Sequence, residues 1–202
     1  VAIEKLREVG MPSPEQRFSA YSWQLSGGLR QRAIIAMALA CNPSVLIADE
    51  PTTAIDVTTQ AQVLELLKRL QADHGSSILF ITHDLGVIAQ VADHVVVMYL
   101  GKVMEQGPVS DIFHRPRHPY TRALLKSMPS LHSEPRVALP TVAGSIPHPL
   151  HRPRGCAFHP RCPDFMPGRC DVRVPALSAA GGRSPVACFL HHDEVEGGGH
   201  DA

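Results

Sequence analysis

A pair of glycines at the start of a helix, followed by an apolar run that ends in two carboxylates, constrains the fold of this chain most strongly. The glycines stand in the segment Leu25-Ser26-Gly27-Gly28-Leu29-Arg30-Gln31-Arg32, and the apolar run is Val45-Leu46-Ile47-Ala48-Asp49-Glu50. A continuous apolar run of this length is typical of a strand in a parallel sheet that is buried on both faces. Ser26 is a favourable N-cap, so we expect a helix to begin there.

Strand-like and helix-like segments alternate through the first 107 residues. We expect an amphipathic helix that ends near His74-Gly75, a second buried strand over 78–81, a short helix after it and a hairpin over 95–105. This alternation predicts a doubly wound α/β sheet with an antiparallel edge. No G-x-x-x-x-G-K-[ST] phosphate loop occurs in the 202 residues. We therefore expect the C-terminal part of a longer chain, with a sheet that is incomplete at the N-terminus.

The charge balance and hydropathy exclude two classes of protein. Lys plus Arg and Asp plus Glu number 19 each. A domain that binds nucleic acid is usually far more basic, so nucleic acid is not an expected partner. No apolar run is long enough to span a bilayer, and no signal peptide is recognisable. We expect a soluble chain that associates with a membrane only through a partner.

Polar side chains follow each of the two expected parallel strands. Asp49 and Glu50 come after the first, and His83 follows the second. Open α/β sheets bind ligands at the carboxyl ends of their strands, and adjacent carboxylates there favour a cation. The pattern predicts Mg²⁺ at Asp49, an attacking water at Glu50 and a phosphate within reach of His83. The helix after Ser26 offers a second phosphate site. Taken singly, each motif is also compatible with an ordinary capped helix or a solvated loop.

Together these motifs resemble the second half of an ABC-type ATPase. Residues 25–28 match the family signature, residues 45–50 the Walker B strand, Thr53-Ala54-Ile55-Asp56 the D-loop and His83 the switch histidine. The resemblance covers about residues 15–107. It implies a P-loop NTPase-type fold, ATP as substrate, Mg²⁺ as cofactor, and a head-to-tail dimer with a second, identical or homologous ATPase subunit.

The resemblance also assigns roles to single residues. It makes Glu50 the catalytic base, His83 a catalytic contact to the γ-phosphate and Asp49 the Mg²⁺ ligand. The residues implied in nucleotide binding are Ser26, Gly27, Gly28, Gln31, Asp49 and Asp56. Leu29 and Ile55 depart from the usual pattern, but they remove no catalytic atom. Without a phosphate loop, the fragment alone is expected to be inactive and to complete a partner's site.

The composition changes after Lys126. We expect residues 1–107 to form the ATPase part, 108–154 a helical segment and proline-rich connector, 155–190 a four-cysteine module and 191–202 a disordered tail. The octet that begins His118-Pro119-Tyr120 resembles the start of the C-terminal extension in ATPases of oligopeptide and dipeptide importers. That family also carries a cysteine set of this arrangement.

Four cysteines stand in the expected module: Cys156, Cys162, Cys170 and Cys188. A unit of about 35 residues rarely folds without a staple, and a cytosolic location disfavours disulfides, so a metal centre is expected. The resemblance favours a [4Fe–4S] cluster; zinc, with His159 as a further ligand, is the alternative, and four unliganded thiols are the third possibility. Cys41 is expected in the core, and His191, His192 and His200 in the tail are expected to be solvated.

The resemblance implies a function in transport. It indicates the ATP-hydrolysing subunit of a peptide importer, peripheral on the cytoplasmic face of the bacterial inner membrane. Transmembrane permease subunits and, indirectly, a peptide-binding protein are the implied partners. The alternatives are import of nickel or another small solute, a soluble ABC ATPase of translation or DNA repair, and a truncated, non-catalytic remnant. The soluble class usually has two ATPase halves or long coiled-coil inserts, and neither is recognisable here.

Overall fold

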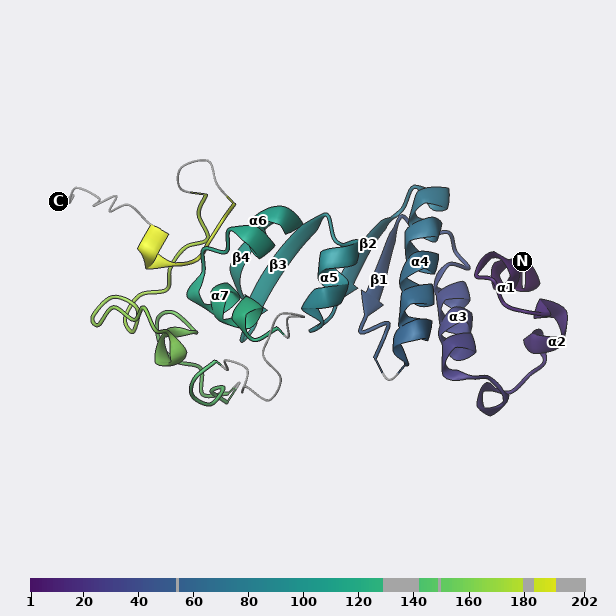
Figure 1. Ribbon diagram of the computed structural model, residues 1–202, viewed down its shortest axis with the longest axis horizontal. Coiled ribbons are helices and arrows are strands. Elements are labelled where there is room, and N and C mark those ends of the chain that lie inside the picture. The colour runs from purple at the N-terminus through teal and green to yellow at the C-terminus, as the bar shows by residue number, and fades with distance from the viewer. Residues whose placement is uncertain (54, 129–141, 149, 180–183, 192–202) are drawn as a thin grey trace, which may run out of the picture. The chain divides into compact units, whose positions relative to one another are not determined.

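The computed structural model describes residues 1–53, 55–128, 142–148, 150–179 and 184–191 (Figure 1). Ala54 of the expected D-loop, much of the expected connector, and His192 and His200 of the tail lie outside these residues. The chain forms two compact units, Val1–Val87 and Ile88–Ala202. Each unit has its own hydrophobic core. The expected boundary at residue 107 marks the end of the ATPase-like motifs, whereas the compact units are divided between residues 87 and 88 by their packing. The boundary at residue 107 stays a prediction.

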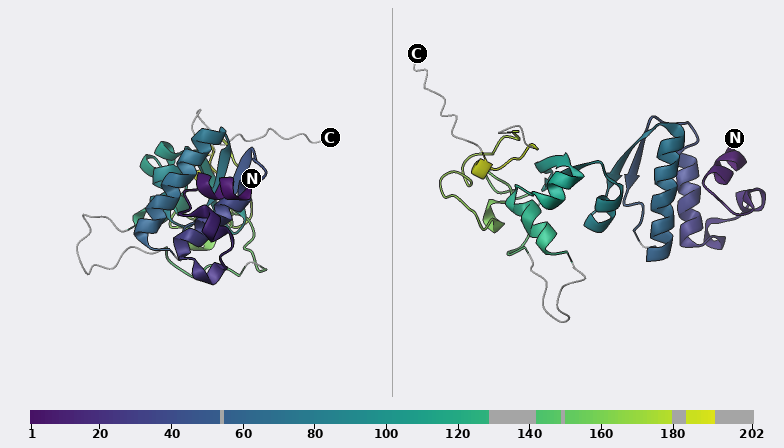
Figure 2. Two further views of the ribbon diagram at one scale, coloured as in Figure 1. Left: turned by 90° about the vertical axis from the view of Figure 1, so that its right-hand side faces the viewer. Right: turned by 45° about the horizontal axis from the view of Figure 1, so that its top comes forward.

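The first unit is built of helices on a two-stranded parallel sheet. Its elements are α1 (Ala2–Glu8), α2 (Pro14–Phe18), the 3-10 helix η1 (Ser22–Gln24), α3 (Gly27–Ala38), β1 (Val45–Asp49), α4 (Val57–His74) and β2 (Ser77–Ile81), with α5 (Leu85–Val91) at its end. α4 lies along one face of β1 and β2, and α3 lies on the far side of α4 (Figures 1 and 2). In the sheet, Asp49 is the register partner of Ile81.

Capping residues set the limits of the two long helices. Ser26 accepts a hydrogen bond at its Oγ from the Leu29 N–H, at 3.4 Å, and α3 begins at the next residue. α4 ends at His74, where Gly75 adopts the left-handed conformation with φ +60° that glycine tolerates. The predicted start at Ser26 and the predicted stop at His74-Gly75 are both confirmed.

The core of the first unit covers only one face of β1. Leu46 packs with Ile35 and Ala36 of α3 and with a row of α4 side chains, among them Val63, Leu66, Leu67 and Leu70. Val45 and Ile47 on the other face are 53 % and 64 % exposed. The prediction that this strand is buried on both faces is therefore wrong for the described residues. A continuous apolar run places apolar side chains on both faces of a strand. In this unit the helices cover only one of those faces, so the other stays exposed.

The second unit begins with an antiparallel hairpin. Its elements are β3 (His94–Tyr99), β4 (Lys102–Pro108), α6 (Val109–His114), α7 (Pro119–Lys126) and the 3-10 helices η2 (His159–Arg161) and η4 (Phe189–His191). The turn residues Leu100 and Gly101 have φ values of +45° and +72°, as a two-residue hairpin turn requires. The hairpin is confirmed, but among the described residues it forms its own sheet and is not an edge of the β1–β2 sheet.

The irregular part of the second unit packs around Phe158. This side chain is fully buried and lies with Tyr99, Met104, Cys156 and Cys170 in one cluster. The rings of Tyr99 and Phe158 meet edge to face, 5.4 Å between centroids. Two single residues differ from expectation. Cys41 is exposed and not in the core, and His191 shares a hydrogen bond of 2.9 Å with the Arg117 carbonyl.

No helix in the described part of the chain combines the length and the apolar character that crossing a bilayer demands.

Candidate functional site

The parallel register of β1 and β2 brings Glu50 and His83 together. The Glu50 N–H donates to the Ile81 carbonyl at 2.9 Å, which continues the ladder by one residue. His83 Nδ1 lies 2.7 Å from Glu50 Oε1, and the Thr53 hydroxyl donates to Glu50 Oε2 at 2.7 Å. Glu50 also has φ +47°, a strained conformation for a residue with a side chain. Each carboxylate oxygen of Glu50 therefore has a hydrogen-bond partner, and the residue adopts a left-handed backbone conformation.

Hydrogen bonding shifts the acid–base behaviour of this pair. The bonds from Thr53 and then from His83 lower the pKa of Glu50 below its ordinary value. The bond to the Glu50 carboxylate, together with its charge, raises the pKa of His83. The pair therefore favours an ionised carboxylate next to a protonated imidazole. The His83 side chain is 83 % exposed, so a ligand in solution can reach it.

The remaining predicted nucleotide residues occupy two places. Asp49 is exposed at the carboxyl end of β1, beside Glu50. Ser26, Gly27 and Gly28 form the start of α3, and Gln31 lies one turn further along it, half-buried. A hollow of about 290 Å³, lined by α3 and α4 residues that include Arg32 and Arg69, contains none of these residues.

Thr59 links Asp56 to Gly28. The Thr59 N–H donates to Asp56 Oδ1 at 2.9 Å and its hydroxyl donates to Asp56 Oδ2 at 2.7 Å, which lowers the pKa of Asp56 and caps α4. A Cβ on Gly28 would come within 2.6 Å of Thr59 Cγ2, whereas a Cβ on Gly27 would have only ordinary contact. The sequence predicted that Gly28 lacks a side chain so that a phosphate can approach the backbone. It did not predict that Thr59 packs against Gly28. The three-residue spacing of an N-cap and its N3 partner could have indicated it.

Three of the four cysteines of the second unit lie in or against one apolar core. Cys156 and Cys170 are buried beside Phe158, Cys162 packs against them, and Cys188 is also buried. Burial raises the pKa of Cys156, and it raises the pKa of Cys162 and of Cys188 to about 11. Neighbouring thiols add to these shifts: Cys162 and Cys156 both interact with other members of the set. Burial thus favours the neutral thiol form of Cys156, Cys162 and Cys188.

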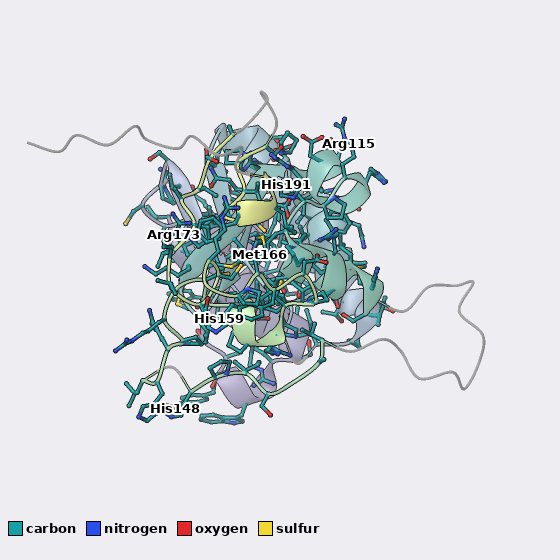
Figure 3. The ribbon with its side chains drawn as sticks, turned by 90° about the vertical axis from the view of Figure 1, so that its left-hand side faces the viewer. Arg115, His148, His159, Met166, Arg173 and His191 are labelled. Atoms are coloured by element: carbon teal, nitrogen blue, oxygen red, sulfur yellow. The ribbon has the colours of Figure 1, made fainter. Side chains whose placement is uncertain are left out.

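The described residues show no preformed metal site at the cysteines. Among the described residues, no three or more His, Cys, Asp or Glu side chains are arranged to hold one metal ion. His159, the alternative zinc ligand, shares a hydrogen bond of 3.0 Å between its Nδ1 and the Cys156 carbonyl. It lies on η2, and in the view of Figure 3 Met166 stands between it and His191 on η4.

A buried polar network lies beside the cysteines. The Glu105 carboxylate accepts hydrogen bonds from the N–H groups of Arg117 and His118, at 2.7 and 3.0 Å. His118 Nδ1 accepts from the Tyr120 N–H at 3.0 Å, which caps α7. Burial lowers the pKa of His118 to about 4, so its ring is neutral at neutral pH. Sequence reasoning noticed His118 only as part of a resemblance and assigned neither residue a role.

Two family descriptions match different parts of the chain. Residues 2–53 match the ABC transporter family, and residues 104–170 match the oligopeptide/dipeptide transporter C-terminal region. The first match includes Ser26, Asp49 and Glu50. The second includes His118 and three of the four cysteines.

Curated relatives agree with both matches. The oligopeptide transport ATP-binding protein AppD of Bacillus subtilis is 50 % identical over 96 % of this chain and 58 % of its own length. The dipeptide transport ATP-binding protein DppD of Escherichia coli is 49 % identical over 96 % of this chain and 59 % of its own. A putative peptide import ATP-binding protein of Brucella melitensis is 49 % identical over 93 % and 57 %. The chain thus spans 57 % to 59 % of the length of these relatives.

A solved structure supports the fold. The ADP conformation of MJ1267, an ATP-binding cassette of an ABC transporter, superposes with a TM-score of 0.52 at 22 % identity, over 60 % of this chain and 48 % of that one. The likeness confirms the P-loop NTPase-type α/β fold. The chain is therefore similar, over nearly all of its length, to ATP-binding proteins of ABC transporters, and its residues 104–170 match the oligopeptide/dipeptide transporter C-terminal region.

Proposed function

We propose that this chain is part of an ATP-hydrolysing subunit that energises the import of peptides. The observation that carries the proposal is the pairing of Glu50 with His83 at the carboxyl end of the β1–β2 sheet, 2.7 Å between their nearest atoms. Relatives named as peptide import, dipeptide transport and oligopeptide transport ATP-binding proteins supply the substrate class.

In this proposal the pair activates and positions water. Glu50 accepts a proton from the attacking water, while Thr53 holds one of its oxygens. His83 is oriented through Nδ1, so its Nε2 is the nitrogen that contacts the γ-phosphate of ATP. Asp49 would hold Mg²⁺, for which an exposed carboxylate is a suitable ligand, and the ion would neutralise charge on the phosphates. Phosphoryl transfer depends mainly on such positioning and charge neutralisation.

The N-terminus of α3 completes the site of a second ATPase subunit. Ser26, Gly27, Gly28 and Gln31 are assigned to the nucleotide of that subunit, and Asp56 to coupling between the two sites. Transmembrane permease subunits and, indirectly, a peptide-binding protein are the further partners. The subunit is then peripheral to the membrane, on its cytoplasmic face. This arrangement follows from the family and is itself part of the proposal.

The test uses the full-length gene product with its partner ATPase and permease subunits in proteoliposomes. Glu50→Gln is expected to reduce ATP turnover by a factor of about 10² to 10⁴, because the base is lost, while ATP still binds. Glu65→Gln on the exposed side of α4 is the control for loss of a carboxylate. Retained turnover in Glu50→Gln would overturn the role of Glu50. Uptake of nickel but not of peptides would overturn the substrate class, and no turnover in the wild type would indicate a non-catalytic remnant.

We further propose that the four cysteines hold a [4Fe–4S] cluster, with zinc as the alternative. The proposal is supported by the packing of Cys156, Cys162 and Cys170 in or against one apolar core, and by the burial of Cys188 within electrostatic reach of Cys156 and Cys170. When bound, a cluster supplies structural cross-linking and one-electron redox chemistry. Iron, sulfide and zinc analysis of the full-length protein after anaerobic purification tests this assignment. One zinc and no iron would favour the alternative, and no metal at all would overturn both.

A further inference from the structure

We propose that Trp23 is a binding residue for the base of ATP in the site of the second ATPase subunit, with its indole ring stacked on that base. The inference rests on the proposed function, which assigns Ser26, Gly27 and Gly28 to the nucleotide of that subunit. These three residues lie at the phosphate end of the nucleotide, and Trp23 adds a contact at the base end. Tyr21 supports the indole ring from its other side.

Trp23 and Tyr21 form an exposed pair of stacked rings. Their ring centroids lie 4.4 Å apart, and the two ring planes differ by only 6°. Tyr21 is 62 % exposed and Trp23 is 75 % exposed. Because Tyr21 covers one face of the indole ring, the exposed surface of Trp23 belongs mainly to the other face and to the ring edges. A flat aromatic surface that is open to water in this way suits a flat aromatic ligand.

The turn that carries the two rings is held by its own hydrogen bonds. In η1 the Tyr21 N–H donates to Gln24 Oε1 at 2.8 Å, and the Gln24 N–H donates to the Tyr21 carbonyl at 2.9 Å. The Leu25 N–H donates to the Ser22 carbonyl at 3.3 Å. The backbone on both sides of Trp23 is therefore fixed, while its side chain is open to solvent. A ring that is held in place before the ligand arrives loses little conformational freedom on binding, which favours affinity.

The same turn leads directly into the start of α3. Leu25 has an extended backbone with φ −102° and ψ 138°, and Ser26, the N-cap of α3, is extended as well. Three residues of extended chain span at most about 10 Å, which limits the separation of the Cα atoms of Trp23 and Ser26. A nucleoside triphosphate whose phosphates lie at the N-terminus of α3 can therefore reach the ring of Trp23 with its base.

The charges that flank this turn along the chain favour an anionic ligand. Arg17 in α2 and Arg30 in α3 are exposed, and neither forms an ion pair among the described residues. Glu15, the acidic residue closest to the turn in the sequence, is paired with Arg7 at 2.6 Å. A ligand that combines a flat aromatic base with negatively charged phosphates matches both the rings and these charges.

A protein partner is the rival occupant of this surface, and Phe18 distinguishes it from a base. Phe18 is the last residue of α2, is 57 % exposed and has no part in the ring stack. A docked protein segment would bury the exposed apolar side chains of this stretch in general, and therefore Phe18 as well as Trp23. A base would stack on the indole ring alone. Every base presents a π face, so loss of that ring should weaken GTP as much as ATP.

The experiment uses the full-length gene product with its partner ATPase subunit. Trp23→Ala should raise the ATP concentration at half-maximal turnover about tenfold, because base–aromatic stacking is lost. Turnover at saturating ATP should stay near the wild type, since the contact holds the nucleotide equally before and during the reaction. Trp23→Phe keeps a smaller ring and should lie between the wild type and Trp23→Ala. Phe18→Ala is the matched control and should behave as the wild type.

Fluorescence tests the contact without hydrolysis. The difference in indole emission between the wild type and Trp23→Phe reports on Trp23 alone. ATP should quench this difference signal, whereas tripolyphosphate, which has phosphates but no base, should leave it unchanged. Quenching by both ligands, or by neither, would contradict stacking on the base.

The possible failures can be told apart. A wild type that hydrolyses ATP, and whose ATP dependence is unchanged in Trp23→Ala, overturns the role of Trp23 alone. Equal effects of Trp23→Ala and Phe18→Ala also overturn it and assign the surface to a protein partner. A wild type without ATP turnover overturns the proposed function, and fluorescence then decides on Trp23: quenching by ATP alone supports the base contact, and any other result contradicts it. If Trp23→Ala does not fold, the same fluorescence comparison decides.

Discussion

At the scale of single residues, a hydrogen bond between Glu50 and His83 links the ends of β1 and β2. Its strength depends on the charges of the carboxylate and the imidazole. Glu50 is the first residue after β1, and His83 is the second after β2. Their hydrogen bond is shared between a carboxylate and an imidazole whose pKa values move in opposite directions. Their separation in pKa therefore grows, and the pH range in which both are charged becomes wider.

We expect Glu50→Gln to lower the pKa of His83 toward its ordinary value of 6.5, because the hydrogen bond and the charge of Glu50 are the main causes that raise it. NMR titration of the His83 ring measures this pKa directly. Asp84→Asn is the matched control: Asp84 also raises the pKa of His83, but as a minor cause. A His83 pKa that is unchanged in Glu50→Gln would show that the contact does not form in solution.

The same pair gives a stability that depends on pH. The pKa of Glu50 is lowered in the folded chain, so its contribution is present above pH 4.5, its ordinary pKa, and is lost as pH falls through the lowered value. The pKa of His83 is raised, so its contribution is present below pH 6.5 and is lost as pH rises through the raised value. The contribution is thus complete between these two ordinary values.

Gly28 gives a second prediction at this scale. Gly28→Ala should reduce the free energy of unfolding by about 1–3 kcal/mol, because the new Cβ would lie 2.6 Å from Thr59 Cγ2. Thr59 cannot rotate away freely, since its hydroxyl is bonded to Asp56 at 2.7 Å. Urea unfolding measures the change. Gly27→Ala is the control, and it should be neutral or stabilise by up to about 1 kcal/mol through helix propensity.

A double substitution identifies the clash as the cause. Thr59→Ser removes Cγ2 and keeps the hydroxyl that binds Asp56. We expect Gly28→Ala to cost much less in the Thr59→Ser background than in the wild type. Equal costs in the two backgrounds would show that Gly28 is required for another reason.

At the scale of elements, the ends of helices could be predicted from nearby residues, whereas the packing of one element on another could not. Ser26 and Gly75 mark helix ends through bonds and conformations within a few residues, so their sequence context was enough. The exposed face of β1 could not be foreseen, because an apolar run does not state which elements cover it. Likewise, the two N–H groups that bind the Glu105 carboxylate lie 12 and 13 positions away from it in the sequence.

The candidate site divides in the same way. Asp49, Glu50 and His83 could be grouped from sequence, because parallel strands bring their carboxyl ends to one edge. Thr59 was missed because it contributes through packing and capping. His118 was found only as part of a motif, since no pattern in the sequence indicates that its side chain is buried.

Glu105 gives the prediction at the element scale. Its carboxylate joins β4 to the start of α7, since it accepts from the N–H groups of Arg117 and His118. Glu105→Gln keeps an acceptor for one N–H but turns an amide N–H toward the other. Loss of a hydrogen bond to a charged group costs about 1.5–3 kcal/mol, so hydrogen exchange at these two amides should become about 10 to 100 times faster.

NMR-detected hydrogen exchange resolves the two amides separately. Glu65→Gln, an exposed carboxylate on α4, should leave both rates unchanged. If Glu105→Gln accelerates exchange equally throughout the unit, global destabilisation is the cause and the local anchoring role is contradicted.

At the scale of the whole molecule, the chain presents an apolar sheet face. Val45, Ile47, Leu79 and Ile81 are all exposed, and they stand on neighbouring positions of the paired strands β1 and β2. Contiguous exposed apolar surface is uncommon on soluble monomers and promotes association. The behaviour of the 202-residue chain in solution should therefore depend on this face more than on isolated exposed side chains.

Dye binding tests this expectation. The 202-residue chain should bind a fluorescent apolar dye, and the double substitution Ile47→Thr with Leu79→Thr should reduce the signal at least about twofold, because threonine suits a strand but replaces apolar surface with a hydroxyl. Val172→Thr with Val174→Thr is the control, since these two valines are at least as exposed as Ile47 and Leu79 but lie outside the named strands and helices. The far-ultraviolet circular dichroism of both variants should match the wild type. If both pairs reduce dye binding equally, exposed apolar area in general binds the dye, and the sheet face has no special part in it.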